Sequence, residues 1–251
     1  MGDFKHPLGN FKVRFLKGAA NLFSLVSIYI LSLFYKIDKR KNEIIISSSF
    51  FAPWKEDVHF KHIYKKIKTD TLLDTKRLYT LWQASITLKD YSGDILDLGC
   101  LKGGAGMLMS KNNLKGKTIL IDTFEGLVES ENYHHKDHFV FKDINSIKNK
   151  INKLKLKNIS VHKGVFPTDF KKKYKNRKFK LCHIDVNTFK STSLSFDFIK
   201  DKVIKNGIII FDDYGIVGVY GVKKFVDQIK KKNKNFIFLN NYMGQCILIR
   251  K

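Results

Sequence analysis

Gly93-Asp-Ile-Leu-Asp-Leu-Gly-Cys-Leu-Lys-Gly-Gly-Ala-Gly106 is the stretch of this chain that decides its fold. It predicts a short buried strand that ends in a glycine-rich turn and leads into a helix. A second strand, Lys117-Thr-Ile-Leu-Ile-Asp122, follows and ends in an acid. Glycines let a ligand approach the backbone, a helix start offers free N–H groups, and an acid at the next strand tip accepts ribose hydroxyls. Together the two strands predict a nucleotide-type pocket.

The spacing of the glycines separates two classes of nucleotide ligand. A dinucleotide site has the pattern G-x-G-x-x-G, whereas this turn carries Gly99, Gly103, Gly104 and Gly106, with Asp97 two residues before the first of them. The absent second glycine and the nearby acid both disfavour a pyrophosphate. A carboxylate suits a cationic ligand, and S-adenosylmethionine carries an ammonium and a sulfonium. The pattern therefore favours S-adenosylmethionine over NAD, and the alternative is a tight strand–helix turn that binds no ligand.

The charge of the chain limits its partners. With 251 residues, a formal net charge of +24 and a pI of about 9.8, both nucleic acid and anionic membrane surfaces have to be considered. Almost all of the excess is lysine, with only five arginines, whereas readers of bases and phosphates often use the bidentate fork of arginine. We therefore expect a solvated lysine surface rather than a nucleic-acid interface.

Cysteine usage indicates a reducing compartment. The three cysteines, Cys100, Cys182 and Cys246, lie in or beside apparent core strands. Their spacing fits neither a metal site nor a disulfide framework. We therefore expect a cytoplasmic protein.

Residues 18–35 form an uncharged run between Lys17 and Lys36. Its length is at the lower limit for a membrane-spanning helix, and it contains serines and an asparagine. It lacks a small-residue cleavage site, which disfavours a secretory signal. Four interpretations stay open: an interfacial membrane helix, a short anchor, a helix buried in a dimer contact, and an ordinary helix of a soluble protein. Association with the inner face of the membrane is thus an alternative to a purely cytoplasmic location.

Three segments organise the chain. Residues 1–45 form an N-terminal extension with the apolar helix, residues 46–92 a helical cap, and residues 93–251 the ligand-binding domain. Within the cap, residues 57–67 and 72–88 show apolar side chains at helical spacing. From residue 94 onward the chain alternates strand and helix. Strands are expected at 94–98, 117–122, 158–162, 180–185 and 207–212, and helices at 104–112, 143–154, 189–202 and 218–232.

This alternation predicts an α/β fold with a parallel sheet and helices on both faces. Two further strand-like runs, 235–239 and 245–250, are joined as a hairpin by Asn240-Asn-Tyr-Met-Gly244. A terminal hairpin is typical of the Rossmann-like class I methyltransferase fold and is usually absent from NAD-binding domains. We therefore expect a mostly parallel seven-stranded sheet with a C-terminal antiparallel hairpin and a helical N-terminal extension.

Acids also follow the fourth and fifth strands. His183-Ile-Asp-Val-Asn187 closes the fourth, and Phe211-Asp-Asp-Tyr-Gly215 closes the fifth. Because ligands bind at the carboxyl ends of parallel strands, we expect Asp185, Asp212 and Asp213 to meet near the cofactor pocket. Three carboxylates repel one another, so a hard cation such as Mg²⁺ would fit among them and would lower the pKa of a substrate hydroxyl. The alternative is that these acids cap helices or pair with lysines.

The chain resembles the macrocin O-methyltransferase (TylF-like) family of class I, S-adenosylmethionine-dependent, metal-assisted sugar O-methyltransferases. The resemblance runs from about residue 50 to the C-terminus and leaves the first 45 residues outside. Its most specific stretch is Asp122-Thr-Phe-Glu-Gly-Leu127. The other matching stretches are Phe51-Ala-Pro-Trp54, Arg77-Leu-Tyr-Thr-Leu-Trp82, Gly93-Asp-Ile-Leu-Asp-Leu-Gly99, Gly103-Gly104, His162-Lys-Gly-Val-Phe-Pro167, His183-Ile-Asp-Val186 and Phe211-Asp-Asp-Tyr-Gly215.

The resemblance implies a role for each matching position. Near the methionine end of the cofactor it implies Asp97, Gly99, Gly103, Gly104 and Asp185. Near the ribose and adenine it implies Asp122, Thr123, Phe124, Lys163, Gly164, Val165 and Phe166. For the metal it implies Asp185, Asp212 and Asp213. The candidate catalytic residues are Asp185, His183 and Asn187.

Asn187 departs from the family, which usually has a second acid at this position, and Asp97 stands where the family more often has Glu. An asparagine can coordinate a metal through its carbonyl oxygen, but it cannot take a proton. Histidine is a candidate base because its pKa lies near neutrality. His183 and His162 each have a structural alternative. The loop with His134 and His135 could close over substrate or be an exposed polar loop.

Three functions stay open at this point. The first is methyl transfer from S-adenosylmethionine to a hydroxyl of a sugar or glycan, with Mg²⁺, by a homo-oligomer. The second is a nucleic-acid methyltransferase, which the charge suggests and the absence of a recognition module disfavours. The third is a non-catalytic, membrane-associated scaffold of the same fold, which Asn187 and the 18–35 run suggest. We expect the first.

Overall fold

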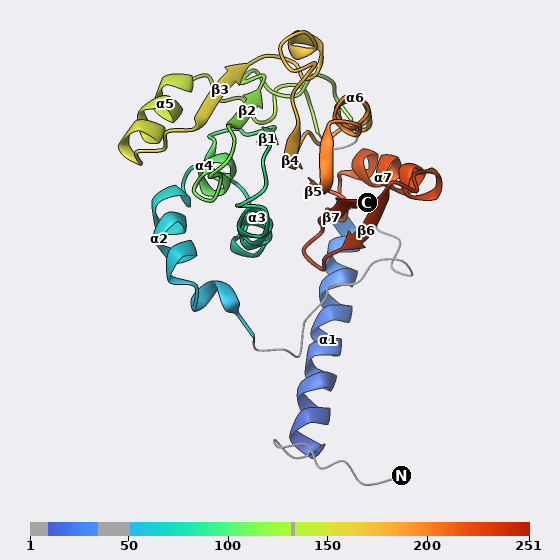
Figure 1. Cartoon of the computed structure of the whole chain (residues 1–251). Helices are drawn as coiled ribbons and strands as arrows, with labels where there is room; N and C mark the ends of the chain where they lie inside the picture. The colour runs from blue at the N-terminus through green and yellow to red at the C-terminus, as the bar shows by residue number, and fades with distance from the viewer. Residues whose placement is uncertain (1–9, 35–50, 132–133) are drawn as a thin grey trace. The chain divides into compact units, whose positions relative to one another are not determined.

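The computed structural model describes residues 10–34, 51–131 and 134–251. Contacts divide the chain into two compact units, residues 1–53 and 54–251. The helix of the first unit is α1 (Asn10–Phe34), which contains most of the uncharged run and begins before it (Figure 1). The earlier start is explained by the residues that precede the run, which include lysine and arginine but neither glycine nor proline within the helix, so nothing there interrupts it. In the part of the chain that the structure describes, no helix combines the length and the apolarity that crossing a membrane requires.

The second unit is built on one sheet, in which the described residues form seven strands in the order β3-β2-β1-β4-β5-β7-β6. The first five strands in the chain pair in parallel, and β7 runs antiparallel to both β5 and β6. This is the predicted Rossmann-like sheet with its terminal hairpin. The strands are β1 (Asp94–Leu98), β2 (Thr118–Asp122), β3 (Ile159–Lys163), β4 (Phe179–Ile184), β5 (Val203–Phe211), β6 (Phe236–Asn240) and β7 (Cys246–Arg250).

Helices cover both faces of this sheet, as Figure 1 shows. The described α-helices of the second unit are α2 (Val58–Ile67), α3 (Thr75–Thr87), α4 (Gly104–Ser110), α5 (Ile144–Lys153), α6 (Phe189–Ile199) and α7 (Tyr220–Lys232). A 3-10 helix lies at Thr168–Phe170, and another, Pro53–Lys55, spans the boundary between the two units. The predicted segments 57–67 and 72–88 thus contain α2 and α3. Both belong to the same compact unit as the sheet.

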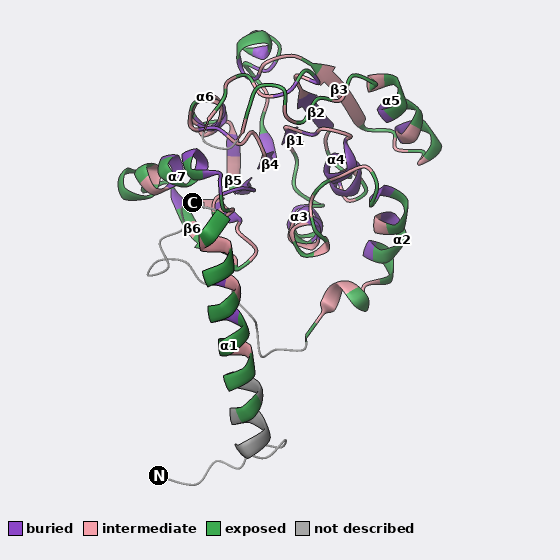
Figure 2. Ribbon diagram, turned by 180° about the vertical axis from the view of Figure 1, so that it is seen from behind, coloured by how far each residue is buried: buried purple, intermediate pink, exposed green. Residues whose placement is uncertain are grey.

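Two hydrophobic clusters form the core, one on each face. Leu96 and Leu98 of β1 belong to the cluster that includes α6 and α7, whereas Ile95 belongs to the cluster that includes α2, α3, α4 and α5. Successive residues of a strand point to opposite faces, which explains this division. Figure 2 shows buried residues along the strands and on the sheet-facing sides of these helices. All three cysteines are buried free thiols.

Strand β5 begins earlier than the sequence pattern predicted. Val203 pairs with Phe179, and a register shift separates this pair from the continuous ladder that starts at Ile208. Within the irregular part, Asn206 has a φ of 62° and precedes Gly207. A glycine and an asparagine suggest a turn, so the pattern alone placed the strand start after them.

Two aspartates start the helices that lead into the sheet. The side chain of Asp57 accepts a hydrogen bond from the backbone N–H of Phe60 in α2 and another from the indole of Trp82. Asp74 caps α3 by accepting from the N–H groups of Lys76 and Arg77, and it also pairs with the Arg77 guanidinium at 2.9 Å. Both are ordinary N-cap residues. Asp74 additionally orients Arg77, which proves to be part of the candidate site.

Candidate functional site

A cavity of about 290 Å³ lies at the carboxyl ends of the parallel strands. Its walls come from the ends of β1, β2 and β4, from the residues after β5, from the segment before α3 and from the loop after β2. Open parallel sheets bind their ligands at this position. The cavity therefore lies where the sequence placed the nucleotide-type pocket.

The glycine-rich turn brings the backbone close to this cavity. Gly99 has a φ of +78°, and a Cβ placed on it would lie 1.8 Å from the carbonyl oxygen of Asp185. No side chain fits there, so only glycine allows the ends of β1 and β4 to approach. Gly103 and Gly104 do not line the cavity. Instead, Gly103 is the N-cap of α4 at a φ of +80°, and the N–H of Gly104 donates to the carbonyl of Asp70 at 2.8 Å.

Asp97 lines the cavity and keeps one carboxylate oxygen without a hydrogen-bond partner. The residue is fully buried, and its Oδ1 lies 2.7 Å from Nδ1 of His183. Its Oδ2 is buried and makes no hydrogen bond. A buried carboxylate oxygen that lacks a partner is costly unless a ligand supplies a donor or a positive charge. Asp97 is therefore suited to a cationic group.

Asp122 closes the opposite side of the turn. Its Oδ2 accepts from the N–H of Leu101 at 2.8 Å, and its Oδ1 accepts from the N–H of Phe124 at 2.7 Å. Burial raises the pKa of the Asp122 carboxyl above its ordinary value, although these backbone donors lower it in part. Each carboxylate oxygen keeps a lone pair for a further donor. The side chain can thus hold the turn and still bind hydroxyls.

The third wall contains the residues implied for the adenine. Gly164, Val165 and Phe166 line the cavity. Lys163 does not, because its ammonium pairs with Glu125 on the exposed side of the sheet edge. Thr123 also lines the cavity, whereas Phe124 packs into the core at 1% exposure.

Arg77 joins the two acids that follow β5. Its Nη1 donates to Oδ2 of Asp212, and the same nitrogen lies 3.8 Å from Oδ1 of Asp213. Oδ1 of Asp212 accepts from Nε2 of Gln245 at 2.7 Å and lies 3.4 Å from Nε2 of His183. Both oxygens of Asp212 therefore have protein partners.

His183 lies between Asp97 and Asp212 and is 1% exposed. Burial lowers the pKa of its imidazole, but the hydrogen bonds and charges of Asp212 and Asp97 outweigh burial and raise that pKa well above its ordinary value. Burial by itself would raise the pKa of the Asp212 carboxyl. The hydrogen bond and charge of His183 and the charge of Arg77 outweigh burial and hold this pKa below its usual range. His183 is therefore a buried cation at neutral pH.

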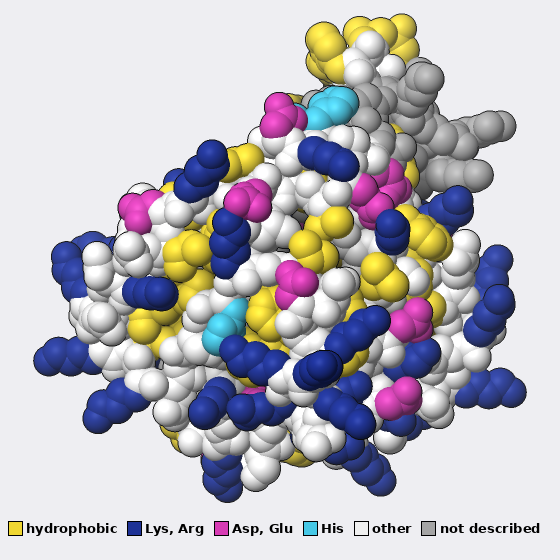
Figure 3. Space-filling view, turned by 90° about the horizontal axis from the view of Figure 1, so that it is seen from above, with side chains coloured by type: hydrophobic (Ala, Val, Ile, Leu, Met, Phe, Trp, Pro, Cys, Tyr) yellow, Lys and Arg dark blue, Asp and Glu magenta, His cyan; other side chains and the backbone are white. Residues whose placement is uncertain are grey.

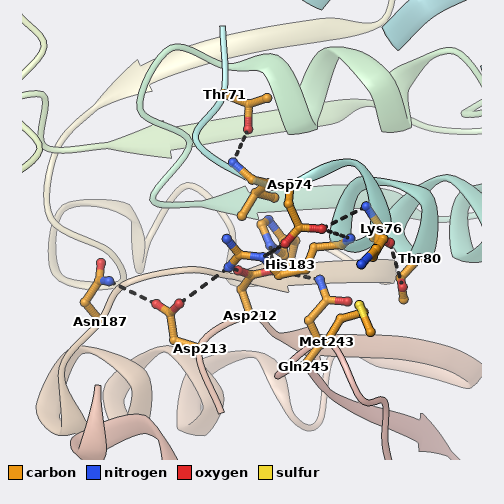
Figure 4. Close-up of polar contacts among 12 residues, drawn as sticks. Thr71, Asp74, Lys76, Thr80, His183, Asn187, Asp212, Asp213, Met243 and Gln245 are labelled. Carbon is orange, nitrogen blue, oxygen red and sulfur yellow. Dashed lines mark hydrogen bonds and ion pairs between the residues drawn. The ribbon is translucent and has the colours of Figure 1, made fainter. Parts of the chain in front are cut away.

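Asp185 and Asp213 are the two acids of the cluster whose pKa values are raised, in contrast to Asp212. Burial, followed by repulsion from Asp213 and Asp212, raises the pKa of Asp185 well above its ordinary value. Burial and the charge of Asp212 raise the pKa of Asp213 to about 6. Nδ2 of Asn187 donates to Oδ2 of Asp213 at 2.9 Å, and the two side chains point toward one another in Figure 4. For this pair of acids, the positive charges of Arg77 and His183 do not offset burial and mutual repulsion.

The donors at this point fit a hard divalent cation. Among the described residues, one oxygen or nitrogen each of His183, Asp185 and Asp212 lies within 4.8 Å of the others. Only the carboxylates can act as ligands here, because both ring nitrogens of the protonated His183 face Asp97 and Asp212. Asp213 adds a further carboxylate, and Asn187 would add a carbonyl oxygen after its amide group turned over, since its Nδ2 faces Asp213. Oxygen ligands of this kind suit Mg²⁺. A cation would also offset the repulsion that raises the pKa values of Asp185 and Asp213.

The loop after β2 covers the cavity and is tied to helix α6. Oε1 of Glu129 accepts from the hydroxyl of Thr188 at 2.8 Å, and Oε2 of Glu131 accepts from the N–H of Phe189 at 2.6 Å. An acid at a helix start is favourable because free N–H groups point outward there. These two contacts fix the loop so that His134 lines the cavity.

His134 has a buried ring nitrogen, Nδ1, that makes no hydrogen bond. Burial and then the neighbouring His138 lower the pKa of His134 below its ordinary value. Its ring contacts the ring of Phe139 at a centroid distance of 5.7 Å. The imidazole is therefore neutral at pH 7 and able to accept a proton.

The cavity brings together most residues that the sequence singled out. These are Asp97, Gly99, Asp122, Thr123, Gly164, Val165, Phe166, His183, Asp185, Asn187 and Asp213. The lining of the cavity does not include the other candidates, which are Gly103, Gly104, Phe124, Lys163 and Asp212. His162 lies away from this cavity, and the Tyr214 hydroxyl donates to Asp227 at 2.8 Å on α7.

Of the wall residues, Arg77 was not assigned a role from the sequence, and His134 was expected only as part of a loop that closes over substrate or stays exposed. Arg77 lies 135 positions before Asp212, so no local pattern links them. Two signals were available: arginine is rare in a chain dominated by lysine, and Arg77 begins one of the stretches that match the family. For His134 the signal was its place in a loop that follows a strand tip.

Comparisons with known proteins agree with this geometry. The sequence profile of the family described as macrocin-O-methyltransferase (TylF) matches residues 64–251. No curated protein sequence matches the chain. The structure is similar to that of the O-methyltransferase NovP, with a TM-score of 0.58 at 16% identity over 72% of this chain and 82% of that one.

Two further solved structures are similar. One is the calicheamicin methyltransferase CalS11, with a TM-score of 0.57 at 12% identity over 81% of this chain and 99% of that one. The other is the O-methyltransferase TomG from Streptomyces achromogenes, solved with S-adenosylmethionine, with a TM-score of 0.53 at 13% identity over 92% and 99% of the two chains. At such identities these likenesses establish the fold.

Proposed function

Because this chain belongs to the macrocin-O-methyltransferase family, we propose that it transfers a methyl group from S-adenosylmethionine to a hydroxyl of a sugar or glycan, assisted by Mg²⁺. Membership of the family makes the chain an O-methyltransferase. The sugar acceptor, the metal and the roles of individual residues are our proposal. The matched region includes the whole sheet and every acid of the site.

The observation that carries the proposal is the unpartnered oxygen of Asp97. S-adenosylmethionine presents an ammonium and a sulfonium, so its methionine end brings the positive charge that this buried carboxylate lacks. Asp97 lies on the cavity wall together with Gly99, whose backbone packs against the carbonyl oxygen of Asp185. Asp122 at the tip of β2 would accept the ribose hydroxyls. Gly164, Val165 and Phe166 would lie along the adenine.

Asp185 and Asp213 are the residues best suited to hold Mg²⁺, with Asn187 as a neutral oxygen ligand. Asp212 would support them, since both of its oxygens already accept hydrogen bonds from Arg77 and Gln245. A bound Mg²⁺ would supply positive charge that lowers the pKa of an acceptor hydroxyl. A sugar offers neighbouring hydroxyls for such a site, which supports this class of acceptor.

The reaction requires a proton acceptor in addition to correct positioning. The acceptor oxygen forms a bond to the methyl carbon while the carbon–sulfur bond breaks, and the hydroxyl proton must leave. Asn187 cannot take it. His183 is a poor candidate because both ring nitrogens face carboxylates and its pKa is raised, so it holds its proton. We infer that His183 positions Asp97 and Asp212.

His134 is the group that we propose takes the proton. It lines the cavity, its Nδ1 lacks a hydrogen bond, and its lowered pKa keeps it neutral at pH 7. The lowered pKa makes His134 a weaker base than a free histidine, but it keeps a ring nitrogen unprotonated at pH 7 and so available for a proton. Replacing His134 by Gln should reduce turnover about a hundredfold and remove the acidic limb of the pH–rate profile. His138→Gln, in the same loop, is the matched control.

Calorimetry with S-adenosylmethionine tests the cofactor part of the proposal. The full chain is titrated in the presence of Mg²⁺ and in the presence of EDTA. We expect saturable binding in both conditions, and we expect Asp97→Asn to weaken it at least about tenfold because a buried charge pair is lost. Asp197→Asn, an exposed acid on α6, is the matched control. Wild-type binding without an Asp97 effect would contradict the assignment of the methionine end.

Turnover with labelled cofactor tests the acceptor. A panel of sugars, nucleotide sugars and glycans is offered together with non-sugar hydroxyl compounds and with RNA. Methylation confined to sugar hydroxyls supports the proposal. Methylation of RNA alone would show that the acceptor is a nucleic acid and would contradict the proposed sugar acceptor. Cofactor binding without turnover on any acceptor would instead indicate a non-catalytic member of the family.

A further inference from the structure

A second cavity, of about 300 Å³, lies at the edge of the sheet and shares no lining residue with the first. It is bounded by the starts of β2 and β3 and by the segment 173–177 that leads into β4. Lys117 and Asn158, which line it, immediately precede β2 and β3. Because these strands are parallel, this end is opposite to the strand tips where the methyl-transfer site lies.

The lining of this second cavity is cationic. Lys117, Lys157, Lys173 and Arg177 all contribute, and its lining contains no acid. Arg177 is the one of these that pairs with a carboxylate, Asp94, at 3.0 Å. Figure 3, which views the molecule from above Figure 1, shows many lysine and arginine side chains on that face, with fewer acids among them. The lysines around the cavity thus add to a field that attracts anions.

Tyr174 lines this cavity and carries a buried hydroxyl that lacks a hydrogen-bond partner. Such a hydroxyl is available to a ligand. The residue is 1% exposed, its ring stacks on Phe170 at a centroid distance of 5.6 Å, and it lines the cavity. Its hydroxyl is buried and makes no hydrogen bond. Burial raises the pKa of Tyr174 to about 12, so the hydroxyl keeps its proton and can donate. Buried hydroxyls without a partner are uncommon in folded proteins.

His162 adds a second polar group to the same wall. Its Nδ1 lies 3.2 Å from Nζ of Lys173, and its Nε2 lies 3.1 Å from Oγ of Ser160. Burial, followed by the charges of Lys173 and Lys148, lowers its pKa. An anion placed in the cavity would face several cations, a hydroxyl donor and an imidazole, and would meet no lining carboxylate.

We propose that this cavity binds a phosphate group, carried by a phosphate ester or a diphosphate. Its charge excludes S-adenosylmethionine, whose reactive end is cationic and whose candidate site is lined by acids. A dianion of tetrahedral shape can accept from Tyr174 and from the lysines at once, because each of its oxygens takes several donors. The cavity volume exceeds that of a single phosphate, which favours a ligand with a further group attached. This proposal does not depend on the acceptor of the methyl group.

Calorimetry with inorganic diphosphate tests the site, using the full chain at constant ionic strength and without divalent metal. We expect saturable binding. Tyr174→Phe removes only the hydroxyl, so it should leave the melting temperature unchanged or slightly higher and weaken diphosphate binding about tenfold. If the hydroxyl were purely structural, Tyr174→Phe would instead lower the melting temperature and leave diphosphate binding unchanged. The double variant Lys117→Gln/Lys157→Gln should weaken binding further.

The matched control is the double variant Lys231→Gln/Lys232→Gln on α7, which removes the same charge from exposed positions outside the cavity. Equal binding by wild type and Tyr174→Phe, or an equal loss in the control variant, would each overturn the proposal.

The phosphate could belong to a free metabolite or to a lipid headgroup. Vesicles of phosphatidylcholine with and without phosphatidic acid separate these sources. Vesicle binding that requires phosphatidic acid and is lost in Tyr174→Phe would identify the headgroup. Diphosphate binding that vesicles do not displace would identify a free phosphate ester. Binding of neither diphosphate nor vesicles would overturn the site.

Discussion

Nδ1 of His183 lies 2.7 Å from Oδ1 of Asp97, and the two residues are neighbours across the parallel strands β1 and β4. The other ring nitrogen faces Asp212 at 3.4 Å. One buried imidazolium thereby links the carboxylate proposed for the methionine end of the cofactor to the acids proposed for the metal. Asp97 and Asp212 share the positive charge of His183. Removing or neutralising one of these carboxylates should therefore alter the pKa of the other.

Replacing His183 by Gln should weaken S-adenosylmethionine binding about tenfold and lower the free energy of unfolding by about 3 kcal/mol. Glutamine is neutral, so two buried carboxylates lose the charge that stabilises them. Calorimetry and urea unfolding measure the two effects. His59→Gln, an exposed histidine on α2, is the control and should change neither. Unaltered cofactor affinity in a folded His183→Gln protein would contradict a positioning role.

Replacing Asp185 by Asn should abolish turnover but leave the metal-free protein as stable as the wild type, or more stable. Burial and the neighbouring acids raise the pKa of Asp185, so its charge opposes folding, and a neutral amide removes that opposition. The variant should also lose the rise in melting temperature that Mg²⁺ gives the wild type. Thermal unfolding with Mg²⁺ and with EDTA measures this. Turnover equal to that of the wild type would contradict the metal assignment.

The sequence was sufficient to predict the sheet because strong local signals mark it. Short apolar runs such as Ile119–Ile121 end at acids or glycines, and these boundaries agree with the structure to within a few residues. Strand β5 was placed too late, since Asn206 and Gly207 look like a turn although the chain pairs with β4 before them. Tertiary pairing overrode the local signal there.

The candidate site was predictable only where a residue lies at a strand tip. Asp97, Asp122 and Asp185 could be found because the carboxyl ends of parallel strands meet. The pairing of Asp97 with His183 needs the strand order, in which β4 lies beside β1, and the contact of Arg77 with Asp212 joins residues 135 positions apart. The cavity at Tyr174 depends on packing at a sheet edge, for which no motif exists.

Replacing Gly99 by Ala should lower the free energy of unfolding by at least about 3 kcal/mol and abolish cofactor binding. The residue has a φ of +78°, and an added Cβ would lie 1.8 Å from the Asp185 carbonyl oxygen. Gly18→Ala is the matched control, because nothing lies within 4 Å of a Cβ there and alanine favours the helix α1. Urea unfolding compares the two. Equal stability of both variants would show that the turn relaxes freely.

His162 should make the protein less stable as the pH falls. Burial and then the charges of Lys173 and Lys148 lower its pKa in the fold, so the unfolded chain, with a pKa of about 6.5, binds the proton first. The loss begins as the pH falls through about 6.5 and is complete below the folded pKa. Urea unfolding between pH 8 and 5 should show a smaller acid-induced loss in His162→Gln than in the wild type. Identical slopes would rule out His162 as the source.

Replacing Asn187 by Asp should make stability depend on Mg²⁺ more strongly than in the wild type. Nδ2 of Asn187 donates to Asp213 at 2.9 Å, so an aspartate at this position would replace a donor with a charge beside an acid whose pKa is already raised to about 6. In EDTA we expect a loss of about 1–3 kcal/mol in the free energy of unfolding. Saturating Mg²⁺ should restore most of it, because the added carboxylate becomes a ligand.

Thermal unfolding over a range of Mg²⁺ concentrations measures this dependence, and the Asp185→Asn/Asn187→Asp double variant is its control. If Asp185 is a ligand, the double variant should show a smaller Mg²⁺ effect than Asn187→Asp alone, since it regains only the number of carboxylates found in the wild type. If Asn187→Asp lost stability in EDTA and Mg²⁺ restored none of it, the acids after β4 and β5 would be a hydrogen-bonded cluster held by Arg77 and His183. The methyl transfer would then depend on His134 and positioning without a metal.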